Sequence, residues 1–272
     1  MPLKADEIEA SPRIGGIGST TGRLRLVIPA FHEVESLRIL LNRVTAALEK
    51  QSLPFDILVV DDDSCDGTEE FVSSMARNDP RIHLLVRKGE RGLSGAVLYG
   101  WQHCDATVLG VMDADLQHPP ELLPALVDAI QTGCDIAIGS RYVRGGRVDR
   151  WNPLRRLLSA AAVWVTWPLQ RCCIKAHDPM SGFFLVRREC VEKVELQSGG
   201  FKLLLEILVR GRIESVREVP IAFGRRAAGK SKANLRVAWE YFRLLVRLYA
   251  ARYGLSRPTA PVSIVPEEYP GD

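Results

Sequence analysis

The stretch VMDADLQHPP, residues 111–120, is the part of this chain that decides how its fold is understood. An apolar run ends there in Asp113-Ala114-Asp115, and Gln117 follows two residues later. Two carboxylates and an amide oxygen at the mouth of an expected strand are the hard oxygen donors that Mg²⁺ or Mn²⁺ prefers. The alternative is a turn with solvated acids, because Asp is a common turn residue. The surrounding sequence decides between the two.

Apolar runs and amphipathic stretches alternate along the first half of the chain. Strands are expected at residues 24–28, 57–60, 82–86, 107–112 and 136–138, and helices at about 35–50, 67–77, 94–103 and 121–131. This alternation indicates βαβ units and a mostly parallel sheet. Ligands bind such sheets at the carboxyl ends of the strands. Polar residues collect at the ends of the expected strands: Glu33, Asp61, Asp62, Asp113, Asp115 and Arg141.

The second half of the chain is less regular. We expect helices over 155–169, 201–210 and 233–252, and strands over 183–186 and 216–223. Residues 1–22 are polar and contain Gly, Ser and Pro, and residues 255–272 hold four prolines. Such segments cannot bury enough apolar surface to fold, so we expect a disordered lead and a disordered tail.

Composition and charge disfavour several classes of protein. A formal net charge of +3 over 272 residues is too small to indicate a nucleic-acid partner. No window reaches 18 uncharged apolar residues, so no membrane-spanning helix is expected. The first strand is not followed by G-x-G-x-x-G, which disfavours a Rossmann oxidoreductase. The run from Asp62 to Gly67 matches the start of an EF-hand loop, but Ser73 stands where that loop needs Glu.

Six motifs follow one another in a fixed order: VIPAFHEVESL (27–37), LVVDDDSCDGT (58–68), VMDADLQHPP (111–120), AIGSRYVRGG (137–146), DPMSGFFLVRRE (178–189) and FGRRAAGKSK (223–232). In this order and spacing the chain resembles the family-2 glycosyltransferases of GT-A fold. Among these it is similar to the dolichyl- or polyprenyl-phosphate mannose synthases, over about residues 23–250. The resemblance implies an α/β fold with a mostly parallel, Rossmann-like sheet flanked by helices. It implies a GT-A catalytic domain over 23–232, including an interfacial helix at 155–170, and a C-terminal amphipathic helix at 233–254.

The resemblance also implies a reaction. Mannose moves with inversion from GDP-mannose to a polyprenyl or dolichyl phosphate and gives polyprenyl-phosphate mannose. An alternative is a related enzyme that uses UDP-glucose or another nucleotide sugar. A non-catalytic binding subunit is a further alternative, against which the intact metal motif and the intact R-x-x-G-x-S-K motif argue. No general base is needed, because a phosphate monoester is already ionised at pH 7.

Site residues are carried over from the motifs position by position. The metal ligands for Mg²⁺ or Mn²⁺ are Asp113, Asp115 and Gln117. The acceptor phosphate is assigned to Arg141 and Arg155, and the catalytic set is Asp115, Arg141, Arg155 and Arg226. Phe31-His32 stands where the family usually has Tyr-Asn, so a hydroxyl is lost there. The nucleotide-sugar set is Pro29, Phe31, Glu33, Val60, Asp62, Asp113, Ala114, Asp115, Gln117, Arg226 and Lys232.

The lipid acceptor requires an apolar surface near the site. The segment at 155–170, with Trp164 and Trp167 after a basic start, is typical of an interfacial helix. The helix at 233–252 is either a second one or packs on the sheet as core. We therefore expect a peripheral protein on the cytoplasmic face of a membrane, alone or with a membrane-anchoring partner.

Overall fold

The computed structural model describes residues 22–148, 159, 161–170, 174–196, 202–224 and 235–253. Apart from Gly22, the expected lead at 1–22 lies outside these residues, and the expected tail at 255–272 lies outside them entirely. Three of the candidate site residues, Arg155, Arg226 and Lys232, also lie outside the described residues.

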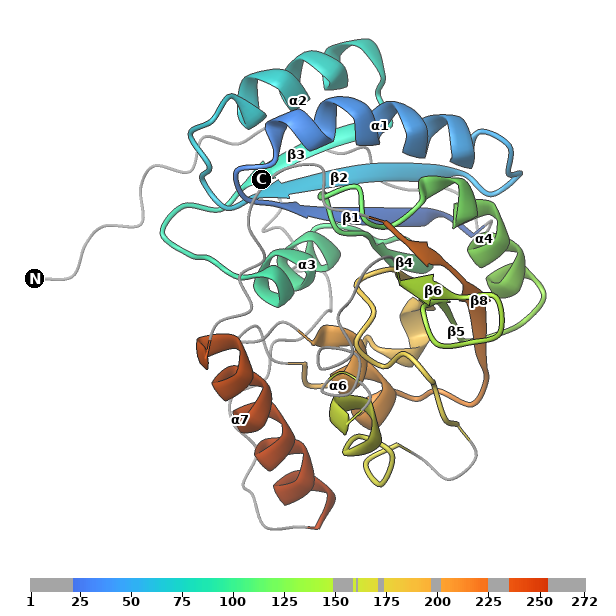
Figure 1. The fold of residues 1–272 in the computed structure, drawn as a ribbon. Helices are drawn as coiled ribbons and strands as arrows, with labels where there is room; N and C mark the ends of the chain where they lie inside the picture. The colour runs from blue at the N-terminus through green and yellow to red at the C-terminus, as the bar shows by residue number, and fades with distance from the viewer. Residues whose placement is uncertain are drawn as a thin grey trace, which may run out of the picture.

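A seven-stranded sheet runs through the centre of the molecule (Figure 1). The strand order is β3-β2-β1-β4-β7-β5-β8, and every neighbouring pair is parallel except the two that involve β7. The expected mostly parallel α/β sheet is therefore confirmed. The strands are β1 (Leu24–Ala30), β2 (Phe55–Asp61), β3 (Ile82–Val86), β4 (Val108–Val111), β5 (Ile136–Ser140), β7 (Phe184–Arg187) and β8 (Val216–Pro220).

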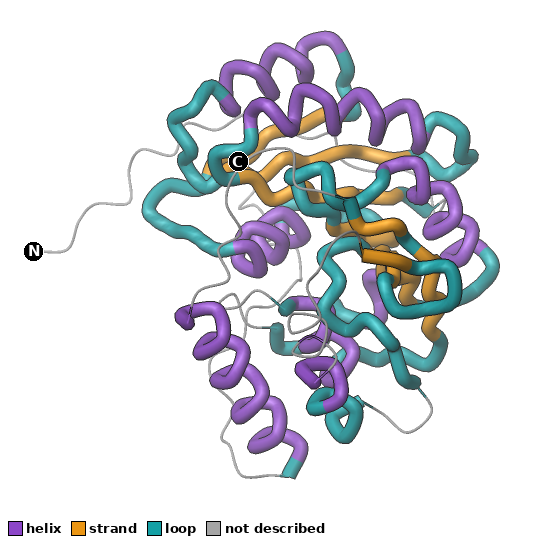
Figure 2. The backbone as a smooth tube through the Cα atoms, viewed as in Figure 1, coloured by secondary structure: helices purple, strands orange, loops and turns teal. Residues whose placement is uncertain are grey.

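Helices cover both faces of the sheet (Figure 2). Helices α1, α2 and α4 place apolar side chains in a core on one face, and α3 and α6 form a second core on the other. Strands buried on both faces are apolar throughout for this reason, which is why the sequence shows continuous apolar runs. The helices are α1 (Val34–Leu48), α2 (Thr68–Asn78), α3 (Leu93–Gln102), α4 (Leu123–Gln131), α6 (Leu203–Arg210) and α7 (Leu235–Arg252), with 3₁₀ turns η1 (Pro120–Leu122) and η2 (Arg188–Cys190).

The register of the sheet brings several candidate residues to one edge. Pro29 on β1 pairs with Val60 on β2, and β4 ends beside β1, where Val27 pairs with Val111. Because β7 is antiparallel, its first residue, Phe184, pairs with Val111. The segment that precedes β7 therefore joins the carboxyl edge of the parallel strands.

The structure corrects two expected elements. The helix expected over 155–169 ends by Trp164, and residues 165–169 form turns. Pro168 explains the end, because a proline donates no backbone hydrogen bond and disfavours helical backbone in the residue before it. The strand expected over 216–223 is two strands. After β8 the chain turns at Ile221, and β9 (Ala222–Phe223) pairs in a separate two-stranded sheet with β6 (Arg147–Val148).

The described side chains of the C-terminal helix α7 pack on α6 and on the turns at 165–169. Leu244, Leu245 and Leu248 form a small core with Leu169 and Leu205. The hydroxyl of Tyr241 donates to the carbonyl of Ala162 at 2.6 Å, and that of Tyr249 donates to Val165 at 2.7 Å. The opposite side of α7 exposes Trp239, Phe242 and Val246.

Candidate active site

The end of β1 carries the residues expected to meet the nucleotide. The Phe31 ring is partly buried, and the guanidinium carbon of Arg91 lies 4.6 Å from its centroid, within cation–π range. The hydroxyl of Ser36 donates to Glu33 at 3.1 Å, so this acid lies at the N-terminus of α1. An aromatic face, a guanidinium and a carboxylate thus lie at this strand end.

Asp62, after β2, is held by a partner that the sequence did not indicate. Its Oδ1 accepts from Nε and Nη2 of Arg87 at 2.8 and 2.6 Å, and its Oδ2 accepts from the Gly92 amide at 2.8 Å. Both side chains are buried, so this is a desolvated ion pair in which two guanidinium nitrogens share one carboxylate oxygen. It fixes the loop 87–92, which carries Arg91 to the Phe31 ring. Through this loop, Asp62 therefore acts on the strand end that carries Phe31.

The other acids after β2 order the loop itself. Asp61 accepts from the Ser64 amide at 3.1 Å and from the Ser64 hydroxyl, and the same hydroxyl accepts from the His32 amide at 2.9 Å. His32, Asp63 and Cys65 have φ values of 58°, 57° and 51°. These local hydrogen bonds stabilise left-handed backbone that non-glycine residues seldom adopt.

The expected metal motif lies directly after β4. Oδ2 of Asp113 is 3.3 Å from Nε2 of His118, and Oδ1 of Asp113 is buried without a hydrogen-bond partner among the described residues. The buried Asp115 accepts from the Gln117 amide at 3.1 Å. Nε2 of Gln117 donates to the carbonyl of Gly224 at 3.1 Å, so its side-chain oxygen is the atom left for a cation.

The oxygen donors of Asp113, Asp115 and Gln117 suit a divalent ion that takes its remaining ligands from a bound substrate. A buried carboxylate oxygen without a partner is costly unless something compensates it. The described residues contain no cluster of three or more His, Cys, Asp or Glu side chains that could hold a metal on their own. Two carboxylates and an amide would leave coordination positions for phosphate oxygens, as Mg²⁺ sites commonly do.

Two residues that the sequence analysis missed fix the position of Asp113. His118 is buried between the rings of Phe183 and Phe223, with centroids 5.4 and 5.1 Å away. A Cβ added to Gly182 would lie 2.8 Å from Cγ and Oδ1 of Asp113 and closer still to Oδ2. The Asp113 carboxylate therefore lies directly against the Gly182 backbone, and this position requires glycine. Motif spacing in the sequence does not reveal that requirement.

Arg141 lies at the end of β5 and is clamped by Asp178. Its Nε, Nη2 and backbone amide donate to this carboxylate at 2.8, 2.7 and 3.0 Å. Asp178 is fully buried and Arg141 nearly so. Burial alone would lower the pKa of Arg141, but the hydrogen bonds and charge of Asp178 outweigh it and raise the pKa. Arg141 is thus a permanently charged group in a fixed orientation.

Lys202 is a second cation beside Arg141. The sequence analysis did not identify it. It precedes α6, and its charge interacts with Arg141, Asp113 and Asp178. Burial and the charge of Arg141 lower the pKa of Lys202, whereas the two acids oppose that shift. A lysine directly before the apolar helix at 203–208 was the only signal in the sequence.

The last motif begins beside the metal motif. The amide of Gly224 donates to the carbonyl of Gln117 at 2.9 Å, and the Gln117 side chain returns the bond to Gly224. The basic segment that carries Arg226 and Lys232 starts one residue later, and both of these lie outside the described residues, as does Arg155.

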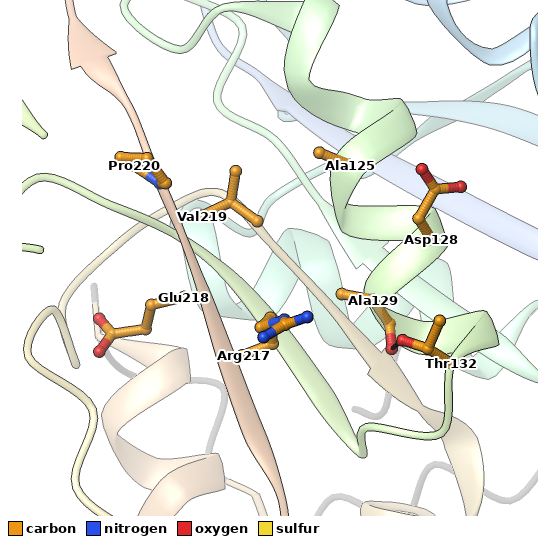
Figure 3. Close-up of a pocket in the computed structure, with 8 residues that line it drawn as sticks. All are labelled: Ala125, Asp128, Ala129, Thr132, Arg217, Glu218, Val219 and Pro220. Atoms are coloured by element: carbon orange, nitrogen blue, oxygen red, sulfur yellow. Dashed lines mark hydrogen bonds between the residues drawn. The ribbon is translucent and has the colours of Figure 1, made fainter. Parts of the chain in front are cut away.

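A hollow of about 380 Å³ lies elsewhere, between α4 and β8 (Figure 3). None of the candidate site residues lines it. It is open, and its charged residues, Asp128, Arg217 and Glu218, do not form a donor set like that of Asp113, Asp115 and Gln117. The candidate site is therefore the carboxyl edge of β1, β2, β4 and β5.

A carboxyl-edge site of this kind on a mostly parallel sheet defines a class of protein. Residues 26–195 match the model of glycosyl transferase family 2, and the chain belongs to this family. It is a glycosyltransferase of GT-A-like fold. No helix among the described residues has the length and apolarity needed to cross a bilayer.

The similar proteins narrow this class. A dolichol-phosphate mannosyltransferase of Pyrococcus furiosus is 45% identical over 226 residues, which are 83% of this chain and 63% of that protein. One of Saccharomyces cerevisiae is 35% identical over 84% of this chain and 88% of that protein. A polyprenol monophosphomannose synthase of Mycolicibacterium smegmatis is 38% identical over 80% and 84%. This chain thus spans slightly less than two thirds of the Pyrococcus protein and most of the other two.

Solved structures share the fold at low sequence identity. Mannosyl-3-phosphoglycerate synthase from Rubrobacter xylanophilus has a TM-score of 0.64 at 18% identity, over 88% of this chain and 77% of that one. Glucosyl-3-phosphoglycerate synthase from Mycobacterium tuberculosis, in complex with Mn²⁺, UDP and its product, has a TM-score of 0.61 at 16% identity, over 87% and 81%.

Proposed function

We propose that this chain transfers mannose with inversion from GDP-mannose to the phosphate of a polyprenol or dolichol. The observation that carries the proposal is the meeting of Asp113, Asp115 and Gln117 with Arg141 at one edge of the sheet. Relatives that are 35–45% identical over most of this chain are dolichol-phosphate mannosyltransferases, which supports mannose and a lipid phosphate. GDP as the donor nucleotide is part of the proposal.

The metal motif would hold Mg²⁺ or Mn²⁺, with Asp115 as the first ligand, Gln117 as the second and Asp113 bound directly or through water. A bound divalent ion would offset the charge that develops on the departing nucleoside diphosphate. The orphan oxygen of Asp113 and the side-chain oxygen of Gln117 supply suitable donors. His118 and Gly182 keep Asp113 in place, so this motif is organised before any ligand arrives.

The acceptor end needs cations, because two anions must come together. Arg141, held by Asp178, and the nearby Lys202 would orient the acceptor phosphate and reduce its repulsion from the diphosphate. We assign Arg155 to the same phosphate, and Arg226 and Lys232 to the diphosphate, on the motifs alone. The nucleophile arrives ionised, so no residue is assigned the role of a base.

Exposed apolar surface supports a peripheral attachment to the membrane. Trp164 stacks on Trp167 at 5.6 Å, and Trp239 stacks on Phe242 at 5.7 Å, and all four rings are exposed. The tyrosine bonds from α7 hold the two pairs on neighbouring segments. Exposed Trp and Phe beside basic residues such as Arg243 suit the interface of a bilayer. We place this surface on the cytoplasmic leaflet, with or without a membrane-anchoring partner.

One experiment tests the proposal and separates its alternatives. The protein is incubated with Mg²⁺ or Mn²⁺, a polyprenyl phosphate in liposomes, and labelled GDP-mannose or UDP-glucose in parallel. Label should enter the lipid from GDP-mannose, and Asp115→Ala should abolish the transfer. Asp105→Ala, at an exposed position before β4, is the matched control and should keep activity. Transfer only from UDP-glucose would refute the mannose assignment, and no transfer from either donor would favour a binding subunit.

A further inference from the structure

Glu218 on β8 makes an unusual set of contacts with the segment that precedes β7. Its Oε2 accepts from the backbone amide and Nδ1 of His177 at 2.9 and 2.7 Å. Its Oε1 accepts from the backbone amide of Asp178 at 3.1 Å. The side chain of Glu218 is only 9% exposed. Both oxygens of one carboxylate thus fix two consecutive backbone amides.

The residue that Glu218 fixes is the residue that clamps Arg141. Asp178 is 0% exposed, and its two oxygens accept the fork of the guanidinium and the Arg141 amide. Glu218 pairs with Ile138 on β5, the strand that ends just before Arg141. The chain of contacts therefore runs from β8 through the backbone of 177–178 to the side chain of Arg141, with each step at hydrogen-bond distance.

The charges show that this arrangement does more than fasten β8 to its neighbour. The carboxylates of Glu218 and Asp178 repel each other. A second carboxylate is therefore a costly way to satisfy the backbone amides of residues 177 and 178. The cost is offset where a buried guanidinium needs an anion in one orientation. Arg141 is that guanidinium, and its fork accepts only a narrow range of carboxylate positions.

We infer that Glu218 is a positioning residue for Arg141 and acts through Asp178. The inference rests on the proposed function in one respect, the assignment of the acceptor phosphate to Arg141. The side chain of Glu218 points away from α4 and the hollow beside it, toward residues 177–178, and lies outside the set that would touch substrate (Figure 3). It is therefore a remote determinant of how the enzyme binds its lipid phosphate.

Glu218→Gln is the discriminating change because glutamine keeps the size of the side chain and has one acceptor oxygen. The amide group can satisfy either His177 or Asp178, and it turns N–H donors toward the other. Asp178 then shifts, and the fork of Arg141 loosens. Because a misplacement of about 1 Å can cost a factor of about 100, we expect the apparent acceptor KM to rise roughly tenfold. The donor KM should stay within about twofold.

The first readout needs no substrate. The Nε–H signal of Arg141 in ¹⁵N–¹H spectra, assigned with Arg141→Lys, should move in Glu218→Gln and stay in place in Glu214→Gln. Glu214 is an exposed acid just before β8 and serves as the matched control. If Glu218→Gln fails to fold, His177→Ala makes the same comparison, because its side chain is 59% exposed and only the Nδ1 bond is lost. An unmoved Arg141 signal in the folded variant overturns the inference.

The second readout is kinetic. In the Arg141→Lys background the bidentate clamp is absent, so adding Glu218→Gln should raise the acceptor KM by less than about twofold. A full tenfold rise in that background, or an equal rise of donor and acceptor KM in the single variant, overturns the inference. If wild type transfers no sugar, the proposed function fails, whereas the spectroscopic result still decides whether Glu218 positions Arg141.

Discussion

Gly182→Ala tests whether the position of Asp113 limits the rate. The added Cβ would lie 2.8 Å from Cγ and Oδ1 of Asp113, whereas ordinary contacts begin at 3.4 Å. The carboxylate must therefore move by at least about 0.6 Å. The φ of Gly182 lies outside the left-handed region, so alanine adds bulk without backbone strain.

The expected loss follows from this displacement. A misplacement of about 1 Å can cost roughly 100-fold, so we expect kcat to fall by about 10- to 100-fold, which corresponds to about 1.4–2.8 kcal/mol in the activation barrier. The Mn²⁺ concentration for half-maximal activity should rise as well. The assay is initial-rate transfer from labelled GDP-mannose over a titration of Mn²⁺, with the thermal midpoint measured on the same samples.

Gly133→Ala is the control. Gly133 is exposed and has a φ of +104°, and a Cβ added there would meet no atom within 4 Å. Alanine at this position is strained by about 1–2 kcal/mol but lies far from the metal motif. The control should lower the thermal midpoint and leave kcat unchanged. Wild-type kcat and Mn²⁺ dependence in Gly182→Ala would refute the reasoning, as would an equal loss of kcat in both variants.

Three further outcomes are expected. Burial would raise the pKa of Asp56, but a hydrogen bond from His83 and the charges of Arg25 and Arg23 lower that pKa below its ordinary value of 3.8. Asp56→Asn should therefore cost about 3 kcal/mol of unfolding free energy at pH 7. That cost should shrink in urea titrations below pH 3.8, where the wild-type carboxylate protonates; a constant cost would contradict the pairing. Arg87→Met leaves Asp62 buried without its guanidinium and should raise the donor KM about tenfold, with the acceptor KM unchanged; equal changes in both would argue against a nucleotide role. Trp239→Ser should weaken sedimentation with anionic liposomes by at least about tenfold, whereas Ile39→Ser, equally exposed on α1, should not; equal effects would exclude this surface.

The parallel part of the fold follows from the sequence because buried strands have a simple pattern. The run at 82–86 is a strand with the bounds expected, and the other early strands differ by a few residues at their ends. The end of the 155–169 helix was misplaced because apolar periodicity was followed through Pro168. The insertion of β7 between β4 and β5 could not be foreseen, because apolar pattern encodes burial and not the order of strands.

The candidate site likewise contains residues that the sequence predicts and partners that it does not. Asp113, Asp115 and Arg141 lie at one edge, as residues after parallel strands must. Their partners were not predictable, since Arg87 is 25 residues from Asp62 and Asp178 is 37 from Arg141. Such pairs depend on the register of distant strands, and the same register decides that Gly182 is the residue facing Asp113. The roles of Arg155, Arg226 and Lys232 remain predictions from motifs.

The antiparallel strand β7 also dictates when the site can exist during synthesis. Strands β4 and β5 meet only through β7, which is made from residues 184–187. A nascent chain that has reached residue 148 holds all the acids of the metal motif but presents an open strand edge beside them. Gly182, Asp178 and Glu218 are still to come. The closed sheet and the contacts that hold Asp113 and Arg141 are therefore completed in the same late step of synthesis.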